Sequence, residues 1–289
     1  ARAAYVMDNF MHWMGLHGKS FLPLFLGFGC NVPAVMGTRV IESWPARILT
    51  ILLAPFVPCS ARLAIIAFLA PAFFGKNAFI ISWGLILSSI VILMIVGVIM
   101  NKIFFKGERT AFIMELPLYH IPNWRTALLL IWQRSLSFLK HAGSIILMMS
   151  VVVWALSEFP SGDLETSFLA QIGNFFAPVG NWMGFDWKLT VALITSFMAK
   201  ENAIATLGVL FGRTEEFSLL QTIANTYTPA VGLAFMVVTL LFIPCVATVA
   251  VIKKETGSWK WTMVNIVLML VVSIGMGSAV YAIASRLGL

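Results

Sequence analysis

Apolar residues run along this chain in long uncharged stretches separated by short polar or basic segments. The longest uninterrupted stretch covers residues 78–100, and another covers about 262–285. A helix needs about 20 apolar residues to cross the hydrocarbon core of a bilayer, so each stretch predicts a membrane-spanning helix. In the second stretch, Gly275 and Gly277 would let a neighbouring helix approach closely.

Two other apolar stretches are interrupted by residues that break a helix. Residues 46–74 are interrupted at Pro58-Cys59, and residues 217–252 at Pro244-Cys245. Proline lacks a backbone N–H and glycine loosens a helix, so in the stretch from Gly27 to Ala34 we expect free carbonyl and amide groups. Within a bilayer such groups are tolerated only where protein or a wet cavity surrounds them.

Two shorter segments carry a polar break in the middle. In residues 20–38 the break is Gly29-Cys30-Asn31, followed by Pro33, and in residues 189–212 it is Lys200-Glu201-Asn202. The arms on either side of each break are too short to cross a membrane alone. We therefore expect each segment to be broken or re-entrant, dipping into the bilayer and returning to its own side.

The rest of the chain is expected to flank or link these parts. Residues 1–19 fit the end of a preceding helix and a turn, and we expect the chain to be a fragment of something longer. Residues 124–140 suit an amphipathic helix at the membrane surface, which leads into a span at about 141–158. An acidic outer loop is expected at 160–187.

A repeat relates the two halves of the chain. Residues 56–65 and 242–251 share Phe, Val or Ile, Pro and Cys in order, with Ala at the sixth and ninth places. Each copy follows one polar-broken segment and precedes one clean span. The positive-inside rule places the basic loops on the cytoplasmic side. All of these loops can lie there only if the two broken segments enter the membrane from opposite sides, which predicts an inverted repeat.

Composition agrees with a membrane protein, since 60% of the 289 residues are hydrophobic and 11% are charged, against about 25% charged in soluble domains. The net charge of +7 comes from short loops, so it indicates orientation in the membrane and not nucleic-acid binding. The sequence therefore predicts an all-α, polytopic integral membrane helix bundle with two broken or re-entrant gate segments. No nucleotide site is predicted, because residues 15–20 lack the spacing of a phosphate-binding loop.

Three cysteines, Cys30, Cys59 and Cys245, stand at three of the helix breaks. Soft sulfur together with amide or carbonyl oxygen suits a borderline transition metal, whereas carboxylates alone would favour magnesium or calcium. Inert packing of the cysteines is the alternative. Glu115 and His120 could also bind metal, although a solvated interface is the better interpretation for both.

Charged residues inside the apolar stretches need partners. Glu201 would cost about 2.5–3.5 kcal/mol there unless it is paired. Neighbouring residues on a helix point apart, so either Lys200 and Glu201 have other partners or the segment is unwound. Arg62 also needs a partner, either Glu42 or a backbone carbonyl.

Several motifs resemble the membrane domain of FeoB-type ferrous iron transporters, in order and over nearly the whole chain. They are Gly29-Cys30-Asn31-Val32-Pro33-Ala34, Pro58-Cys59-Ser60-Ala61-Arg62, Met114-Glu115-Leu116-Pro117, Ala199-Lys200-Glu201, Pro244-Cys245-Val246-Ala247 and Glu255-Thr256-Gly257. Gly37 and Asn202-Ala203 depart from the family pattern. The resemblance divides the chain into residues 1–19, a first Gate repeat at 20–101, a linking region at 102–186, and a second Gate repeat with the final span at 187–289.

The resemblance implies uptake of Fe²⁺, as transported substrate, across a bacterial or archaeal cytoplasmic inner membrane by a multi-pass protein. It implies no enzyme activity in this chain, because family members carry their GTPase in a separate cytosolic GTP-binding domain. That domain is an expected partner, with small cytosolic accessory proteins and a homo-oligomer left open. The alternatives are a concentrative nucleoside-type carrier, a membrane-embedded enzyme acting on lipid, and a non-transporting membrane subunit.

The candidate site follows from the breaks. The predicted metal ligands are Cys30, Asn31, Cys59, Glu201 and Cys245. The predicted gate backbone consists of Gly29, Pro33, Pro58, Lys200, Asn202 and Pro244. We expect the three sulfurs to converge near the bilayer midplane, with one or two of them binding the ion at a time, because a transport site must also release it.

Overall fold

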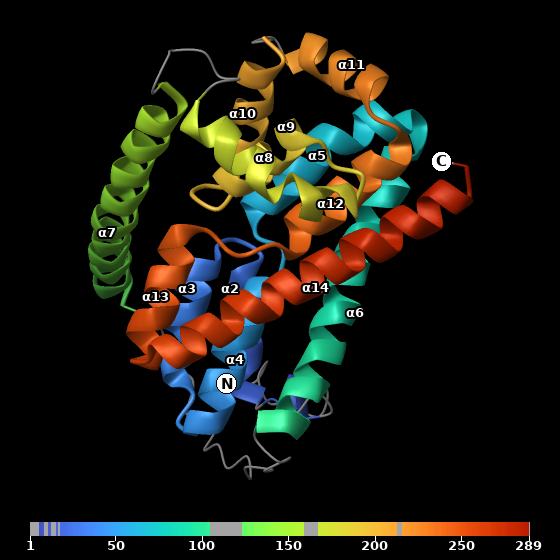
Figure 1. Ribbon diagram of the computed structural model, residues 1–289. Helices are drawn as coiled ribbons and strands as arrows, with labels where there is room; N and C mark the ends of the chain where they lie inside the picture. The colour runs from blue at the N-terminus through green and yellow to red at the C-terminus, as the bar shows by residue number, and fades with distance from the viewer. Residues whose placement is uncertain are drawn as a thin grey trace.

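The computed structural model describes residues 6–8, 11–12, 16, 18–104, 123–158, 167–212 and 216–288. Every regular element in these ranges is a helix, which confirms the all-α prediction (Figure 1). The α-helices are α2 (Phe21–Gly27), α3 (Asn31–Gly37), α4 (Trp44–Leu53), α5 (Ser60–Phe74), α6 (Ala78–Phe104), α7 (Trp124–Glu158), α8 (Phe168–Asn181), α9 (Trp187–Thr195), α10 (Asn202–Leu210), α11 (Glu216–Thr226), α12 (Pro229–Leu241), α13 (Val246–Thr256) and α14 (Trp259–Arg286). Short 3₁₀ turns η1 (Gly18–Ser20), η2 (Thr38–Val40), η3 (Ala54–Phe56) and η4 (Gly75–Asn77) connect some of them.

Three stretches of the described chain are long and apolar enough to cross a membrane, namely 44–104, 229–256 and 259–286. The predicted clean spans correspond to α6 and α14. With 27 and 28 residues, these helices are about 40 Å long, so each exceeds the roughly 30 Å hydrocarbon core. In Figure 1, α14 crosses the bundle diagonally, and tilting is one way in which a long span fits a bilayer.

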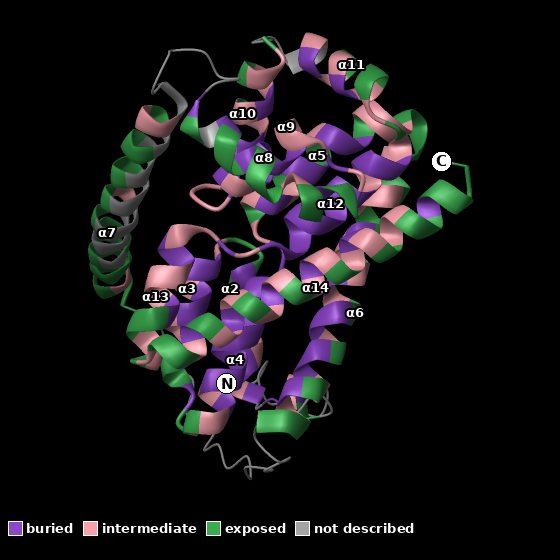
Figure 2. Ribbon diagram, in the orientation of Figure 1, coloured by how far each residue is buried: buried purple, intermediate pink, exposed green. Residues whose placement is uncertain are grey.

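The centre of the bundle is α12, which packs against α14 and α5. Nearly all of its side chains are buried, from Ala230 to Leu241, and Figure 2 shows the helix in purple behind α14. A helix that is apolar all round lies either in a protein core or in lipid, and the burial of α12 places it in the core. The second Pro-Cys break, at 242–245, follows α12 directly, so this buried helix places that break inside the protein.

Both polar-broken segments fold as pairs of short helices. Helices α2 and α3 pack against each other across the break at 28–30, and α9 and α10 do so across the break at 196–201. Neither segment is a straight crossing helix, as predicted. The inverted two-fold relation of the two halves stays a prediction.

Hydrogen bonds at Asp186 fix the start of the second pair. The Asp186 carboxylate accepts from the backbone N–H of Leu189, which caps α9, and from the hydroxyl of Tyr227, which precedes α12. Burial, followed by the bond to Asp186, raises the pKa of Tyr227 above its ordinary value. The phenol therefore stays a hydrogen-bond donor that ties α9 to the central helix.

The linking region differs from its prediction. The surface helix at 124–140 and the span at 141–158 form one continuous helix, α7, along one edge of the bundle (Figure 1). No proline separates the two parts, and a single glycine, Gly143, costs only about 1 kcal/mol inside a helix. The predicted surface helix and span are therefore two parts of one helix.

The expected outer loop at 160–187 also contains a helix, α8, within its described part. The Ser167 hydroxyl caps α8 by accepting from the N–H of Ala170. Gly173 and Gly180 bring α8 close to Val191 and Thr190 of α9. At 14 residues, α8 is shorter than a span, so it forms no long apolar stretch in the sequence.

A pair of glycines on α14 gives a test of the packing at the centre. A Cβ on Gly277 would lie 2.3 Å from Val238 of α12 and 2.9 Å from the sulfur of Met183, whereas a Cβ on Gly275 would have no neighbour within 4 Å. We expect Gly277→Ala to destabilise the fold by about 1–3 kcal/mol through overpacking. The same change at Gly275 should be neutral or stabilising by up to about 1 kcal/mol. Size-exclusion chromatography after heating in detergent measures the difference, and equal heat stability of the two variants would contradict this packing.

Candidate metal-binding site at the helix breaks

Each of the three cysteines occupies the residue just before a helix. Cys30 precedes α3, Cys59 precedes α5, and Cys245 precedes α13, all with extended backbone. All three thiols are free and half-buried. The positions of Cys59 and Cys245 reflect Pro58 and Pro244, which lack the N–H that would continue the preceding helix.

The three cysteines lie in one region. The Cys30 thiol is within electrostatic reach of Cys59, Cys245 and Glu201, so the helix starts of both halves meet there. Among the described residues, no three His, Cys, Asp or Glu side chains are placed to hold one ion together. The structure thus brings the predicted sulfurs near one another without a closed ligand cage, and their role as ligands stays a prediction.

The same backbone hydrogen bond occurs in both halves of the repeat. The N–H of Ser60, which follows Cys59, donates to the carbonyl of Gly29 at 3.2 Å, and the Ser60 hydroxyl donates to the same oxygen at 2.8 Å. The N–H of Val246, which follows Cys245, donates to the carbonyl of Phe197 at 2.9 Å. Each Pro-Cys break is therefore tied to the polar break of its own half. When these two hydrogen bonds are aligned, Met198 occupies the position in the second half that Cys30 occupies in the first.

Arg62 joins the two halves at the centre of the site. Its side chain is 1% exposed, and its guanidinium donates to the carbonyls of Pro55 and Phe242. Of the two partners considered from the sequence, the carbonyl is the one found, while Glu42 binds Lys19 at 2.7 Å. A planar guanidinium with several donors suits this bridge, because one side chain satisfies two carbonyls at once.

Lys200 has the corresponding role in the second half. It is 3% exposed, lies in the non-helical turn between α9 and α10, and donates from Nζ to the carbonyl of Ile243 at 2.7 Å. Both outcomes expected from the sequence thus hold, since the segment is unwound and Lys200 has a partner other than Glu201. The expectation of free carbonyls in residues 27–34 is wrong for Gly29, because Ser60 donates to it. Four carbonyls at the other breaks also accept hydrogen bonds from protein donors, namely those of Pro55, Phe197, Phe242 and Ile243.

One oxygen at the site differs from these carbonyls. Asn31, the first residue of α3, is 4% exposed, and its Oδ1 has no hydrogen-bond partner among the described residues. A buried acceptor without a partner costs about 1–3 kcal/mol. An atom kept at that cost next to Cys30 is a candidate oxygen ligand.

The remaining predicted residues lie around this centre. Glu201 is exposed at the end of the second break, and Asn202 begins α10. Pro33 is in the first turn of α3. Glu115 and His120 lie outside the described residues. Sequence reasoning missed the bridging role of Arg62 and the position of Met198, which the register of the repeat could have indicated.

A cavity of about 410 Å³ borders the second break. Apart from Thr190, its lining side chains are apolar, and they include Phe197, Phe242 and Ile243. A nucleoside site needs polar groups that fix the base and the ribose. This lining supplies one hydroxyl and no carboxylate, so the cavity does not favour the nucleoside-type carrier.

Comparison with known proteins assigns this chain to a family. The family model named Gate, described as "Nucleoside recognition", matches residues 1–73 and 139–259. A second model, described as "Ferrous iron transport protein B C terminus", matches residues 82–134. The chain therefore belongs to the Gate family, as a membrane region of the FeoB type.

Individual relatives agree with this assignment. The chain is 40% identical to the Fe(2+) transporter FeoB of Staphylococcus aureus (strain MSSA476), over 94% of the chain and 41% of that protein. It is 40% identical to the Fe(2+) transporter FeoB of Methanocaldococcus jannaschii, over 91% and 41%. It is 36% identical to the Fe(2+) transport protein A/Fe(2+) transporter FeoB fusion protein of Porphyromonas gingivalis, over 92% and 38%. The chain thus spans about two fifths of the length of these relatives, and no solved structure matches it.

Proposed function

We propose that this chain forms the path by which Fe²⁺ crosses a bacterial or archaeal cytoplasmic membrane, with the ion passing between the two helix breaks. The single observation that carries the proposal is the buried Oδ1 of Asn31, which has no partner within the described structure and lies beside a cysteine near two others. Fe²⁺ takes mixed sulfur and oxygen ligands, and this region offers both. The relatives' names supply the identity of the ion.

We assign the ligands to side chains, while the break carbonyls accept hydrogen bonds from Arg62, Lys200, Ser60 and Val246. Asn31 contributes oxygen, and Cys30 and Cys245 contribute sulfur at the starts of α3 and α13. Glu201, exposed at the edge of the second break, provides the carboxylate that attracts the ion.

Release of the ion follows from a buried cation. Arg62 lies within electrostatic reach of Cys59 and Cys245, so a dication bound at those sulfurs is repelled by its positive charge. Conduction requires binding that is weak enough for the ion to leave. A fixed cation beside soft ligands meets that requirement and makes a permanent iron centre unfavourable.

The partners that we propose for this chain are those that the family implies. We propose that a cytosolic GTP-binding domain controls the passage of the ion, and we assign no catalytic step to this chain. The Porphyromonas gingivalis relative joins an Fe(2+) transport protein A to its transporter in one chain, which supports a small cytosolic accessory protein as a further partner.

Substitution of Asn31 tests the proposal. Asn31→Ala should lower uptake of radioactive Fe²⁺ by about tenfold or more in cells producing the protein that carries this chain, because loss of a metal ligand or its support typically costs 10–100-fold. Asn265 is a matched control, because it is also a buried asparagine whose Oδ1 has no partner in the described residues. Asn265→Ala should change uptake only in proportion to the amount of folded protein. Equal uptake per molecule by the two variants would reject Asn31 as a ligand.

A further inference from the structure

Two helices connect the cysteine region to one end of the molecule. Helix α3 begins after Cys30 and continues through η2 to Val40, and α13 begins after Cys245 and ends at Thr256. The two helices pack against each other. Both run for about 15 Å from the cysteines. Because the two cysteines lie in one region and the helices pack against each other, the helices lie side by side and point the same way.

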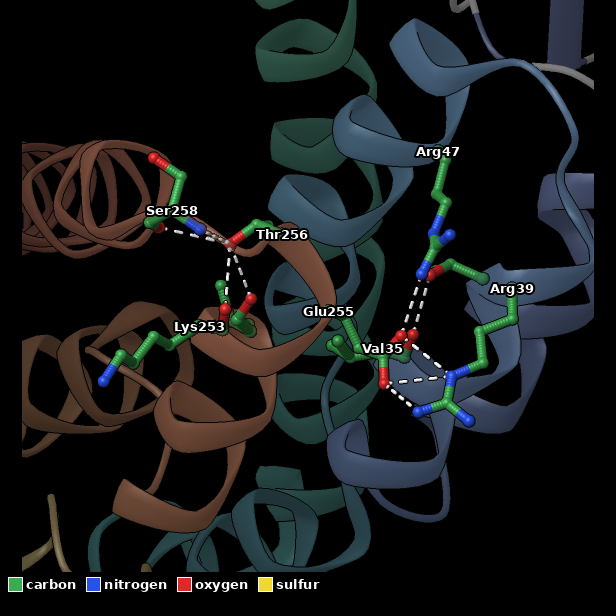
Figure 3. Close-up of polar contacts among 9 residues, drawn as sticks. Val35, Arg39, Arg47, Lys253, Glu255, Thr256 and Ser258 are labelled. Carbon is green, nitrogen blue, oxygen red and sulfur yellow. Dashed lines mark hydrogen bonds and ion pairs between the residues drawn. The ribbon is translucent and has the colours of Figure 1, made fainter.

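The far ends of these helices are joined by one carboxylate, that of Glu255 (Figure 3). Arg39 of η2 donates from Nε to both oxygens, at 3.0 and 2.9 Å, and from Nη2 to one of them. Arg47 of α4 donates from Nη2 at 2.8 Å. The Glu255 side chain is 3% exposed, whereas those of Arg39 and Arg47 are 47% and 28% exposed.

These contacts all cross between the two halves of the repeat. Glu255 belongs to the second half, and both arginines belong to the first. Hydrogen bonds to Glu255 raise the pKa of Arg39, so the Arg39 guanidinium stays charged. Lys253, Lys254 and Lys260 lie at the same end, which the positive-inside rule assigns to the cytoplasm.

We propose that Glu255, Arg39 and Arg47 form a latch that closes the cytoplasmic end of the ion path. The latch holds α13 against α3 and α4, and its release separates the two helices that start at Cys245 and Cys30. While it is closed, two guanidiniums and one carboxylate leave a net positive charge at the mouth, which repels a departing cation. This proposal rests on the proposed function only in taking Fe²⁺ as the ion that passes. Whether the latch is closed determines access to the cysteines, whatever they bind.

Access of a thiol reagent from the cytoplasmic side measures the latch without using iron. Inside-out membrane vesicles holding the protein that carries this chain are treated with an uncharged, sugar-linked methanethiosulfonate that does not cross the membrane, so that the charge of the mouth does not bias its entry. Labelling of Cys30 and Cys245 is then followed by mass spectrometry of their peptides. We expect Glu255→Gln to raise the labelling rate by about tenfold, since losing an ionic contact that favours one state shifts the population of the other by about this much. Glu42→Gln is the matched control, because Glu42 also pairs with a cation, Lys19, but is 88% exposed.

A conservative change separates a latch from damage to the fold. Glu255→Asp keeps a carboxylate for both Arg39 and Arg47 and should leave the labelling rate within about threefold of the original. An unchanged rate in Glu255→Gln would overturn the proposal, as would an equal rise in Glu255→Gln and Glu255→Asp. Because no iron is present, this result stands whether or not the cysteines bind Fe²⁺.

Discussion

Replacing Arg62 by leucine should destabilise the protein by about 3 kcal/mol or more, since it leaves two buried carbonyls without donors at about 1–3 kcal/mol each. Those carbonyls belong to Pro55 and Phe242, one in each half of the repeat. Removing a buried charge can be neutral where the freed groups find new partners. Here they cannot join a helix, because Pro58 and Pro244 interrupt the chain beside them.

The measurement is the fraction of protein that stays monodisperse in size-exclusion chromatography after heating in detergent. Arg125→Leu makes the same change at an exposed site on α7 and should leave the heat stability unchanged. Arg62→Lys should be intermediate, because one ammonium group reaches only one of the two carbonyls. Heat stability of Arg62→Leu equal to that of Arg125→Leu would show that the bridge between the halves contributes nothing.

Serine at Cys30 or Cys245 should lower Fe²⁺ uptake by about tenfold or more while leaving the protein folded. The change keeps the size of the side chain and replaces soft sulfur by hard oxygen, which weakens binding of a borderline metal. Both thiols are half-buried at the starts of helices and form no cap to those helices, so the fold loses little.

Cys59 is the internal comparison for these variants. It shares the region and starts α5, but Asn31 adjoins Cys30 and not Cys59 in the chain. We expect Cys59→Ser to have the smallest effect of the three. Uptake that is unchanged by all three substitutions, at equal amounts of folded protein, would favour packing as the role of the cysteines.

The elements that could be predicted from the sequence are those that depend on local composition. Helices α6 and α14 follow from unbroken apolar runs, and the breaks before α5 and α13 follow from Pro58 and Pro244. The single helix α7 and the short α8 could not be predicted in the same way. A change in amphipathicity does not bend a helix, and α8 is stabilised by close contact with α9.

Partners at the site depend on which segments meet in space, and one chain's sequence does not specify that. Arg62 is recognisable as a buried cation in need of acceptors, yet its second acceptor lies on Phe242, in the other half of the chain. The cysteines could be identified as a candidate set because three soft ligands at three breaks form a pattern. Glu255 gave no such signal, since its burial results from α13 packing against α3.

X-ray absorption at the iron edge tests the central claim most directly. Fe²⁺ is added without oxygen to the purified protein that carries this chain, and the sulfur neighbours of the metal are counted. We predict one or two sulfur ligands together with oxygen or nitrogen ligands, and fewer sulfurs in the variant that combines Cys30→Ser with Cys245→Ser. Iron bound at the same stoichiometry with no sulfur ligand in the unaltered protein would contradict the account.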